Sequence, residues 1–270
     1  LEGCNFYIGG GMGRTHNNEE TFARIADPLG YVEEKDMFEL IQSIVAIQRD
    51  YGDRKSRKNA RMKYLLHQKG IKWFRDILVS KYYRKPIRAL RKEPVNKLID
   101  YLGWQKQNNE KWFVGLPLLS GRLTGEKKLV IRKLVEKYNL DLRLTPNQDV
   151  LICNILNIHK KEIENELKDI GYDNLDEINE IQRHALACPA LPLCGLAMTE
   201  AERILPDILE RIDNLLKSLN IEKTILFRIT GCPNGCSRPY MAELALVGSG
   251  LNKYQLWLGG SKNLQRLAKP

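Results

Sequence analysis

Six cysteines occur in the chain, and four of them form two close pairs. Five residues separate Cys188 from Cys194, three separate Cys232 from Cys236, and the stretch 195–231 lies between the pairs. In a long chain without a recognisable secretory signal, close cysteine pairs point to a metal site rather than to disulfides. The fold must therefore bring two distant segments to one place.

The residues around these four cysteines leave three interpretations open. An iron–sulfur cluster commonly takes four thiolates. A structural zinc ion more often uses cysteines spaced by two to four residues on a tight knuckle, and the third possibility is that the thiols bind nothing. The first gap contains Pro189 and Pro192, which stiffen the loop, and Gly231 and Gly235 permit unusual backbone angles beside the second pair. The pattern favours a cluster over zinc.

The other two cysteines, Cys4 and Cys153, occur in apolar, strand-like runs. A free cysteine in such a run usually behaves as a small hydrophobic residue. We expect both to be buried, inert thiols.

Charge is concentrated in one segment. The chain has 270 residues, 43% hydrophobic composition and a formal net charge of +10. Residues 50–92 contain 15 Lys and Arg against three Asp and Glu, so this segment accounts for the whole net positive charge of the chain. Such a segment attracts a small oxyanion, an acidic protein or nucleic acid, or is simply a solvated helical face. No apolar run is long enough for a membrane span.

Hydrophobic periodicity predicts an α+β fold with mixed sheets and packed helices. We expect a strand that ends in a glycine-rich turn within 1–16, a helix over 34–49 that Gly52 stops, and two helices divided by Gly70. Strands are then expected at 112–119, 140–144 and 150–155, and helices at 127–138 and 159–170. Further strands are expected at 224–229, 241–247 and 254–258. We divide the chain into 1–95, 96–175 and 176–270.

Two shorter segments between these elements are also assigned. The stretch 183–192, which contains the first cysteine, is expected to be irregular. Thr199 and Glu202 fit a capping box, which predicts a helix opening at Thr199 and running to about residue 219.

Four motifs, in order along the chain, resemble the siroheme and iron–sulfur family of sulfite and nitrite reductases. Residues 187–203 (ACPALPLCGLAMTEAER) resemble the first cluster motif of ferredoxin-type assimilatory sulfite reductases, and 230–236 (TGCPNGC) resemble the second. Residues 50–64 resemble the family's basic active-site segment, and 143–148 (RLTPNQ) another of its motifs.

The resemblance implies cofactors, a reaction and a fold. It implies a four-iron four-sulfur cluster held by Cys188, Cys194, Cys232 and Cys236, with Cys236 also bridging to the iron of siroheme. The reaction would be the six-electron reduction of sulfite to sulfide by an oxidoreductase. The fold would be the second half of a pseudo-symmetric siroheme reductase, with 1–95 closing the first half, 96–175 a ferredoxin-like half domain and 176–270 the cluster and siroheme domain.

The chain opens on Leu1 within a strand-like run, so we expect it to be cut from a longer protein. The resemblance implies that a preceding segment supplies two more arginines to the anion site, and that a short C-terminal stretch also lies outside the chain. The fragment alone is therefore expected to be inactive.

The resemblance also nominates residues for substrate and siroheme. Arg61 and Lys63 match a basic–x–basic pattern that would meet sulfite, with Lys63 as the better proton donor because an arginine does not readily release a proton. Residues two apart on a helix do not face each other, so the backbone there should be extended or irregular if both reach one anion. Otherwise they are two solvent-facing helix positions. Lys128, Asn147, Gln148 and Asn234 would contact siroheme, although such Asn residues often cap turns.

The expected partners follow from the same family. Ferredoxin would be the electron donor to a monomer located in a bacterial cytoplasm or a plastid stroma. The nearest alternative is nitrite reduction to ammonia with the same cofactors. An alternative of another class is a basic nucleic-acid-binding protein with a structural metal, which the absence of a recognisable nucleic-acid module disfavours.

Overall fold

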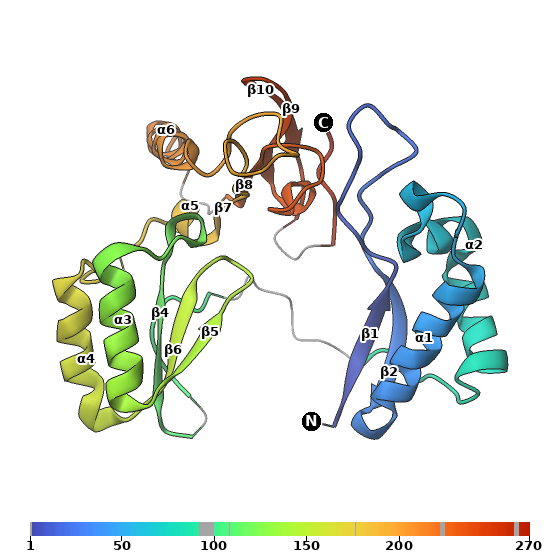
Figure 1. Ribbon diagram of the computed structural model, residues 1–270, viewed down its shortest axis with the longest axis horizontal. Helices are drawn as coiled ribbons and strands as arrows, with labels where there is room; N and C mark the ends of the chain where they lie inside the picture. Colours follow the sequence, from blue (N-terminus) through green and yellow to red (C-terminus); the bar gives the residue numbers. More distant parts are fainter. Residues whose placement is uncertain (1, 92–99, 108, 176, 222–224, 262–264) are drawn as a thin grey trace.

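The computed structural model describes residues 2–91, 100–107, 109–175, 177–221, 225–261 and 265–270. Three separate β-sheets organise these residues into three units (Figure 1). The N-terminal and central units form the two legs of an arch, and the C-terminal unit lies across the top. None of the helices in this part of the chain combines the length and apolar character that a membrane span needs.

The N-terminal unit packs two long helices against a two-stranded sheet. Its strands pair antiparallel, and its main elements are β1 (Gly3–Ile8), β2 (Asp27–Glu33), α1 (Met37–Tyr51) and α2 (Met62–Ile77). Short turns of other helix types flank them: η1 (Glu34–Asp36), η2 (Arg57–Asn59) and η3 (Leu78–Tyr82). The predicted helix that ends at Gly52 is confirmed, and β2 was not foreseen.

Gly70 divides α2 as the sequence indicated. Its backbone angles are φ 79° and ψ 159°, outside the helical region, between two helical stretches. A Cβ atom at this position would meet nothing within 4 Å, so the positive φ rather than space explains the glycine.

The central unit is a four-stranded antiparallel sheet in the order β3-β4-β6-β5. Its elements are β3 (Gly103–Lys106), β4 (Trp112–Leu116), η4 (Leu119–Gly121), α3 (Gly125–Tyr138), β5 (Asp141–Leu144), β6 (Val150–Ile155) and α4 (Asn157–Asp169). Both helices lie side by side against the sheet (Figure 1). Ile131 and Leu134 of α3 and Ile163 of α4 pack with the buried residues of β4 and β6. The predicted strand–helix–strand–strand–helix order is confirmed, with β3 added at its start.

The C-terminal unit holds a second four-stranded sheet in the order β10-β9-β8-β7. β7 and β8 run parallel, as do β8 and β9, while β9 and β10 are antiparallel. Its elements are α5 (Glu180–His184), β7 (Leu186–Ala187), α6 (Leu205–Ser218), β8 (Phe227–Thr230), η5 (Pro239–Met241), β9 (Leu244–Gly250) and β10 (Lys253–Leu258). Part of the segment expected to be irregular is therefore regular, in α5 and β7.

The helix start predicted at Thr199 is wrong. The helix begins at Leu205, with Ile204 at the N-cap position and Pro206 in its first turn. Thr199 is buried and its hydroxyl donates to the Tyr254 hydroxyl at 3.0 Å. Glu202 pairs with Arg122 of the central unit instead of reaching back along its own chain. Tertiary partners outcompete the local capping box.

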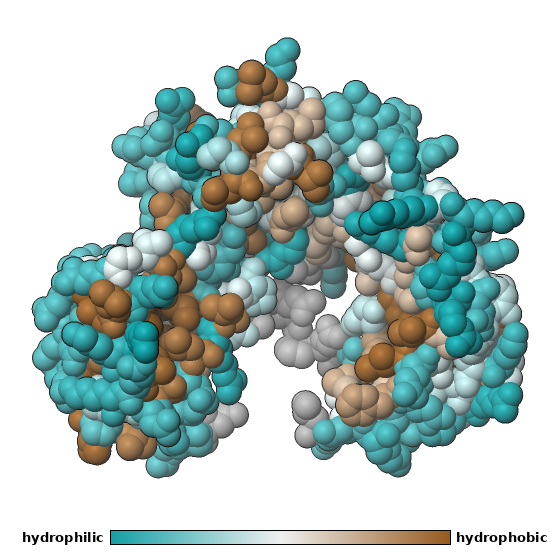
Figure 2. Space-filling model, viewed as in Figure 1, coloured by the Kyte–Doolittle hydropathy of each residue, from teal (hydrophilic) through white to brown (hydrophobic). Residues whose placement is uncertain are grey.

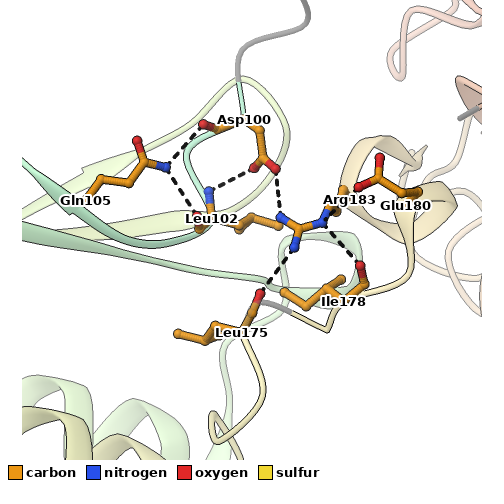
Figure 3. Close-up of polar contacts among 7 residues, drawn as sticks. All are labelled: Asp100, Leu102, Gln105, Leu175, Ile178, Glu180 and Arg183. Carbon is orange, nitrogen blue, oxygen red and sulfur yellow. Dashed lines mark hydrogen bonds and ion pairs between the residues drawn. The ribbon is translucent and has the colours of Figure 1, made fainter.

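Arg183 of α5 forms polar contacts with the start of the central unit (Figure 3). Its guanidinium donates to Asp100 Oδ2 at 2.7 Å, to Ile178 O at 3.1 Å and to Leu175 O at 3.4 Å. The Arg183 side chain is 12% exposed and that of Asp100 is 34% exposed, so the ion pair is only partly shielded from water. The two units are joined by this part-buried polar contact as well as by the chain.

Asp149 gives the central unit a pH-dependent stability. It is 9% exposed, and burial raises the pKa of its carboxyl to about 6 although Leu118 N donates to it. A pKa above the unfolded value means that the charged form disfavours the fold, so stability falls as pH rises from about 4 to 6.

We expect Asp149→Asn, which keeps the acceptor for Leu118, to stabilise the chain more at pH 7.5 than at pH 4.5. The difference should be on the order of 1–2 kcal/mol in urea unfolding. The exposed Asp173→Asn is the matched control and should show no such difference. An equal effect of Asp149→Asn at both pH values would contradict the burial argument.

Candidate functional site

Parallel pairing of β7 with β8 brings the two cysteine pairs together. Ala187 lies opposite Ile229 in the register, and Cys188 and Cys232 follow at the carboxyl ends of the two strands. Carboxyl ends of parallel strands meet at one edge of a sheet, and Cys188 N donates to Ile229 O at 3.3 Å.

The four thiols lie close enough to influence one another. Burial raises the pKa of Cys232, and the charges of Cys188, Cys236 and Cys194 raise it further against a lowering contact from the Asn234 backbone. Burial likewise raises the pKa of Cys236, with Cys188 and Cys194 adding to it. Within the described residues no three Cys, His, Asp or Glu side chains are grouped for a single metal ion. The four thiols therefore lie in one region of the structure.

Cys188 has two donors aimed at its sulfur. Gly231 N donates to the Sγ atom at 3.2 Å, and the Thr230 hydroxyl, 3.4 Å from Sγ and 3.3 Å from Cys232 O, can donate its one proton to either acceptor. Donors of this kind stabilise a thiolate, whether free or bound to iron. The donor set at the site is therefore four cysteines, one of which already carries hydrogen bonds suited to a negative sulfur.

Gly231 also locks the first cysteine loop onto the second. A Cβ atom there would lie 2.7 Å from both Ala190 Cβ and Thr199 O. The Gly231 carbonyl accepts from Met198 N at 2.8 Å and from Thr199 N at 3.3 Å. No side chain fits between these segments.

The glycine-rich segment near the N-terminus lies against the second cysteine loop. Arg14 N donates to Pro233 O at 3.0 Å. A Cβ at Gly13 would be 3.4 Å from Asn234 O and 2.7 Å from an Arg61 nitrogen. The Gly13 position thus borders both the second cysteine loop and the Arg61 guanidinium.

Lys63 is buried beneath this segment. The residue is 1% exposed, and its ammonium donates to Gly13 O and Phe22 O, each at 2.6 Å. Burial, with smaller contributions from Arg61 and Arg14, lowers the pKa of Lys63 to about 8. The ammonium is thus engaged by backbone, and its proton is more easily lost than that of an ordinary lysine.

Arg61 and Lys63 do not occupy two solvent-facing positions of one helix. Arg61 is exposed and extended (φ −77°, ψ 147°) at the N-cap of α2, whereas Lys63 lies inside the first turn. The extended backbone at Arg61 is the condition expected if both cations serve one region.

The four residues nominated for siroheme are arranged differently from one another. The side-chain amide of Gln148 is hydrogen-bonded to the protein backbone, because Nε2 donates to Ala187 O at 2.9 Å and Oε1 accepts from Ala187 N at 3.3 Å. Asn147 is half-buried in the same turn, and Asn234 is exposed between the second pair of cysteines. Lys128 is exposed on α3, and no described contact joins it to the cysteine loops.

Two arginines near the cysteines were missed, of which Arg228 is buried and Arg238 is half-buried. Arg228 of β8 is 2% exposed, and burial together with Arg238 lowers its pKa to about 9. Its Nη1 donates to Arg238 O at 3.0 Å, but its Nε has no partner among the described residues. Burial also lowers the pKa of Arg238, and within the same residues neither guanidinium pairs with a carboxylate. An arginine inside the apolar run of β8, four residues before Cys232, was the available signal.

Among the lone cysteines, Cys153 is buried as expected and burial raises the pKa of its thiol. Cys4 is only half-buried, because β1 belongs to a two-stranded sheet that shields it incompletely. That part of the prediction is wrong.

Two family models match the chain. The nitrite and sulphite reductase 4Fe-4S domain matches residues 1–87, and the nitrite/sulfite reductase ferredoxin-like half domain matches residues 105–170. The chain therefore belongs to the nitrite and sulfite reductase family, whose cofactors are siroheme and a 4Fe-4S cluster. The four paired cysteines lie outside both matched ranges, so their assignment depends on the geometry described above.

Relatives along the whole chain agree. It is 51% identical over 275 residues to a ferredoxin sulfite reductase of Synechococcus elongatus, covering 100% of this chain and 44% of the relative. It is 38% identical to the hemoprotein beta-component of an NADPH sulfite reductase of Myxococcus xanthus, covering 99% of this chain and 48% of that one.

A solved structure has the same fold. The NirA protein of Mycobacterium tuberculosis matches with a TM-score of 0.83 and 25% identity, over 98% of this chain and 48% of NirA. The predicted α+β siroheme reductase fold is confirmed. The chain spans about half the length of the relatives it matches.

We expect Gly231→Ala to destabilise the chain, because the added Cβ meets atoms on two sides that cannot both move. Overpacking of this kind costs about 1–3 kcal/mol, measured by urea unfolding. Gly195→Ala is the matched control in the same region, since a Cβ there meets nothing within 4 Å. Equal stability of the two variants would show that the cysteine loops are not locked at Gly231.

Proposed function

We propose that the protein to which this chain belongs is an oxidoreductase that reduces sulfite to sulfide with six electrons. The observation that carries the proposal is the convergence of Cys188, Cys194, Cys232 and Cys236, from segments far apart in the chain, at one edge of the β7–β10 sheet. The 51% identity to a ferredoxin sulfite reductase supports sulfite as the substrate. Nitrite, which the family also includes, is the less favoured alternative.

The residues fit the two cofactors of the family. Four thiols suit a four-iron cluster, and Cys236 is the exposed member of the set while Cys188 and Cys232 are buried. Cys236 is therefore the thiolate best placed to bridge to a second, larger group. When bound, siroheme would supply the iron at which sulfite is reduced.

Siroheme carries eight carboxylates, which demand cations in a shielded site. Arg228 is buried and Arg238 is half-buried near the cysteine loops, and neither has a carboxylate partner among the described residues. We propose that Arg238, with Asn147 and Asn234, faces the siroheme carboxylates. The exposed position of Lys128 gives no comparable support to its nomination.

We assign the substrate-side cations to Arg61 and Lys63. Arg61 is exposed and offers a fork of donors to an anion. Lys63 holds two backbone carbonyls, so its first role is to anchor the glycine-rich segment over the second cysteine loop. Its lowered pKa makes it a suitable proton source as a second role.

Ferredoxin is the proposed electron donor. Arg54, Lys55, Arg57 and Lys58 are exposed, and the N-terminal unit presents a largely hydrophilic surface in Figure 2. Such a cationic face would attract an acidic protein over a long range. A monomeric enzyme in a bacterial cytoplasm or a plastid stroma completes the proposal. Nothing in the site favours nucleic acid as the main ligand.

The assignment of the cysteine ligands is tested in the complete protein. We expect Cys236→Ser to abolish iron retention and the visible absorption of the coupled cofactors, because one thiolate serves both centres. Cys153→Ser, a buried cysteine in the core of the central unit, is the control and should leave the spectrum unchanged. A full spectrum in Cys236→Ser would remove Cys236 from the ligand set. Assays of the wild-type protein with sulfite and with nitrite decide the substrate.

Variants of Lys63 and Arg61 distinguish the roles of the two cations. Lys63→Met should lower siroheme content, measured by absorption and iron analysis, because the glycine-rich segment loses two charge-assisted bonds of about 1.5–3 kcal/mol each. Arg61→Lys should retain siroheme and raise KM for sulfite only a few-fold, since the charge is kept. Normal siroheme content in Lys63→Met with a loss of kcat alone would assign Lys63 to proton delivery and not to anchoring.

A further inference from the structure

A tight turn of the central unit lies against the cysteine-bearing sheet. Residues 145–149 connect β5 to β6, and Thr145 N donates to Asp149 O at 3.0 Å. The Thr145 hydroxyl accepts from Asn147 N at 3.2 Å and from Asp149 N at 3.1 Å. Gln148 adopts φ 71° within it. The turn is closed by its own hydrogen bonds and so is a rigid element.

One side of the turn holds the first cysteine strand. The Gln148 amide both donates to and accepts from the backbone of Ala187, the residue before Cys188. Among the described strands, β7 is two residues long and lies at the edge of its sheet, paired with β8 alone. The side-chain amide therefore takes the place of a further strand on the open edge of β7.

The other side of the turn holds the second cysteine loop. Arg238 Nη2 donates to Pro146 O at 2.7 Å, and Arg238 lies two residues after Cys236. The carbonyl of Arg238 accepts from the buried Arg228 of β8. One five-residue turn thus contacts the segments that bear both cysteine pairs.

We propose that the turn 145–149 is a clamp that fixes the two cysteine pairs relative to each other, with Gln148 and Arg238 as positioning residues. The proposal rests on the proposed function for the identity of the bound cluster, but the clamp itself is a property of the protein. A strand of two residues makes few ladder hydrogen bonds, so the position of Cys188 depends on the Gln148 amide. Gln148 then acts through Cys188 and not on siroheme.

Local opening of β7 is the first measurement, made by amide hydrogen exchange on the complete protein with and without its cofactors. Gln148→Leu should raise the exchange rates of the Ala187 and Cys188 amides by roughly tenfold or more, because two hydrogen bonds are lost. Gln148→Glu keeps the acceptor and should give a smaller increase, which decides the matter if the leucine variant fails to fold. Gln255→Leu, on the edge strand β10 at the far side of the same sheet, is the matched control and should leave these amides unchanged.

The cluster supplies the second measurement. Iron release to a chelator should accelerate and the reduction potential of the cluster should shift in Gln148→Leu, whose amide contacts Ala187 and not siroheme. Arg238 variants do not serve for this readout, because Arg238 is also proposed to face the siroheme carboxylates. These readouts separate a clamp on the cysteines from a general loss of stability, which Gln255→Leu and urea unfolding report.

The outcomes distinguish the two proposals. Wild-type exchange at Ala187 and Cys188 in Gln148→Leu, with normal iron retention, would overturn the clamp while leaving sulfite reduction intact. A wild-type protein without iron and acid-labile sulfide would overturn the proposed function, and the exchange measurement on that protein would still judge the clamp.

Discussion

The parallel pairing of β7 with β8 is the contact on which the site depends. The two strands are short, yet their register places Cys188 beside the Thr230–Cys232 corner. Without that pairing the cysteine pairs would remain separated by α6 and its connections. The pairing is reinforced from the central unit by Gln148 and from within by Gly231, where no side chain could fit between the loops. A small sheet is thus held in place by contacts from outside it.

The surroundings of the cysteines are rich in buried cations. Lys63 and Arg228 are buried and Arg238 is half-buried, and burial lowers the pKa of each. Their described hydrogen bonds go to backbone carbonyls, which carry no counter-charge, and Arg228 Nε has no partner among the described residues. A buried charge without a counter-charge is costly, so such an arrangement suits a region that receives anionic ligands. Sulfite and the siroheme carboxylates have that character.

Local sequence patterns succeeded where the local backbone makes the decision. Gly70 interrupts a helical stretch because its positive φ is one that other residues avoid, and this holds whatever surrounds it. Gly52 has ordinary extended angles, and a side chain there would meet Gln48 of the preceding helical turn at 2.4 Å. The capping box at Thr199 failed for the opposite reason. Its two polar side chains found Tyr254 and Arg122 in other elements, and those partners moved the helix start to Leu205.

The sequence by itself determined the four paired cysteines, the family that their motifs resemble and the α+β class, because spacing and periodicity are carried by neighbours along the chain. Only the tertiary structure decided which polar groups remain available to a ligand. Gln148 and Asn147 are adjacent and chemically alike, yet the amide of Gln148 is taken by Ala187 while Asn147 is half-buried beside it. Lys63 is a cation like its neighbours, yet it is buried and its ammonium donates to two backbone carbonyls. A side chain's role is set by the partner that meets its hydrogen bonds, and that partner comes from a distant segment.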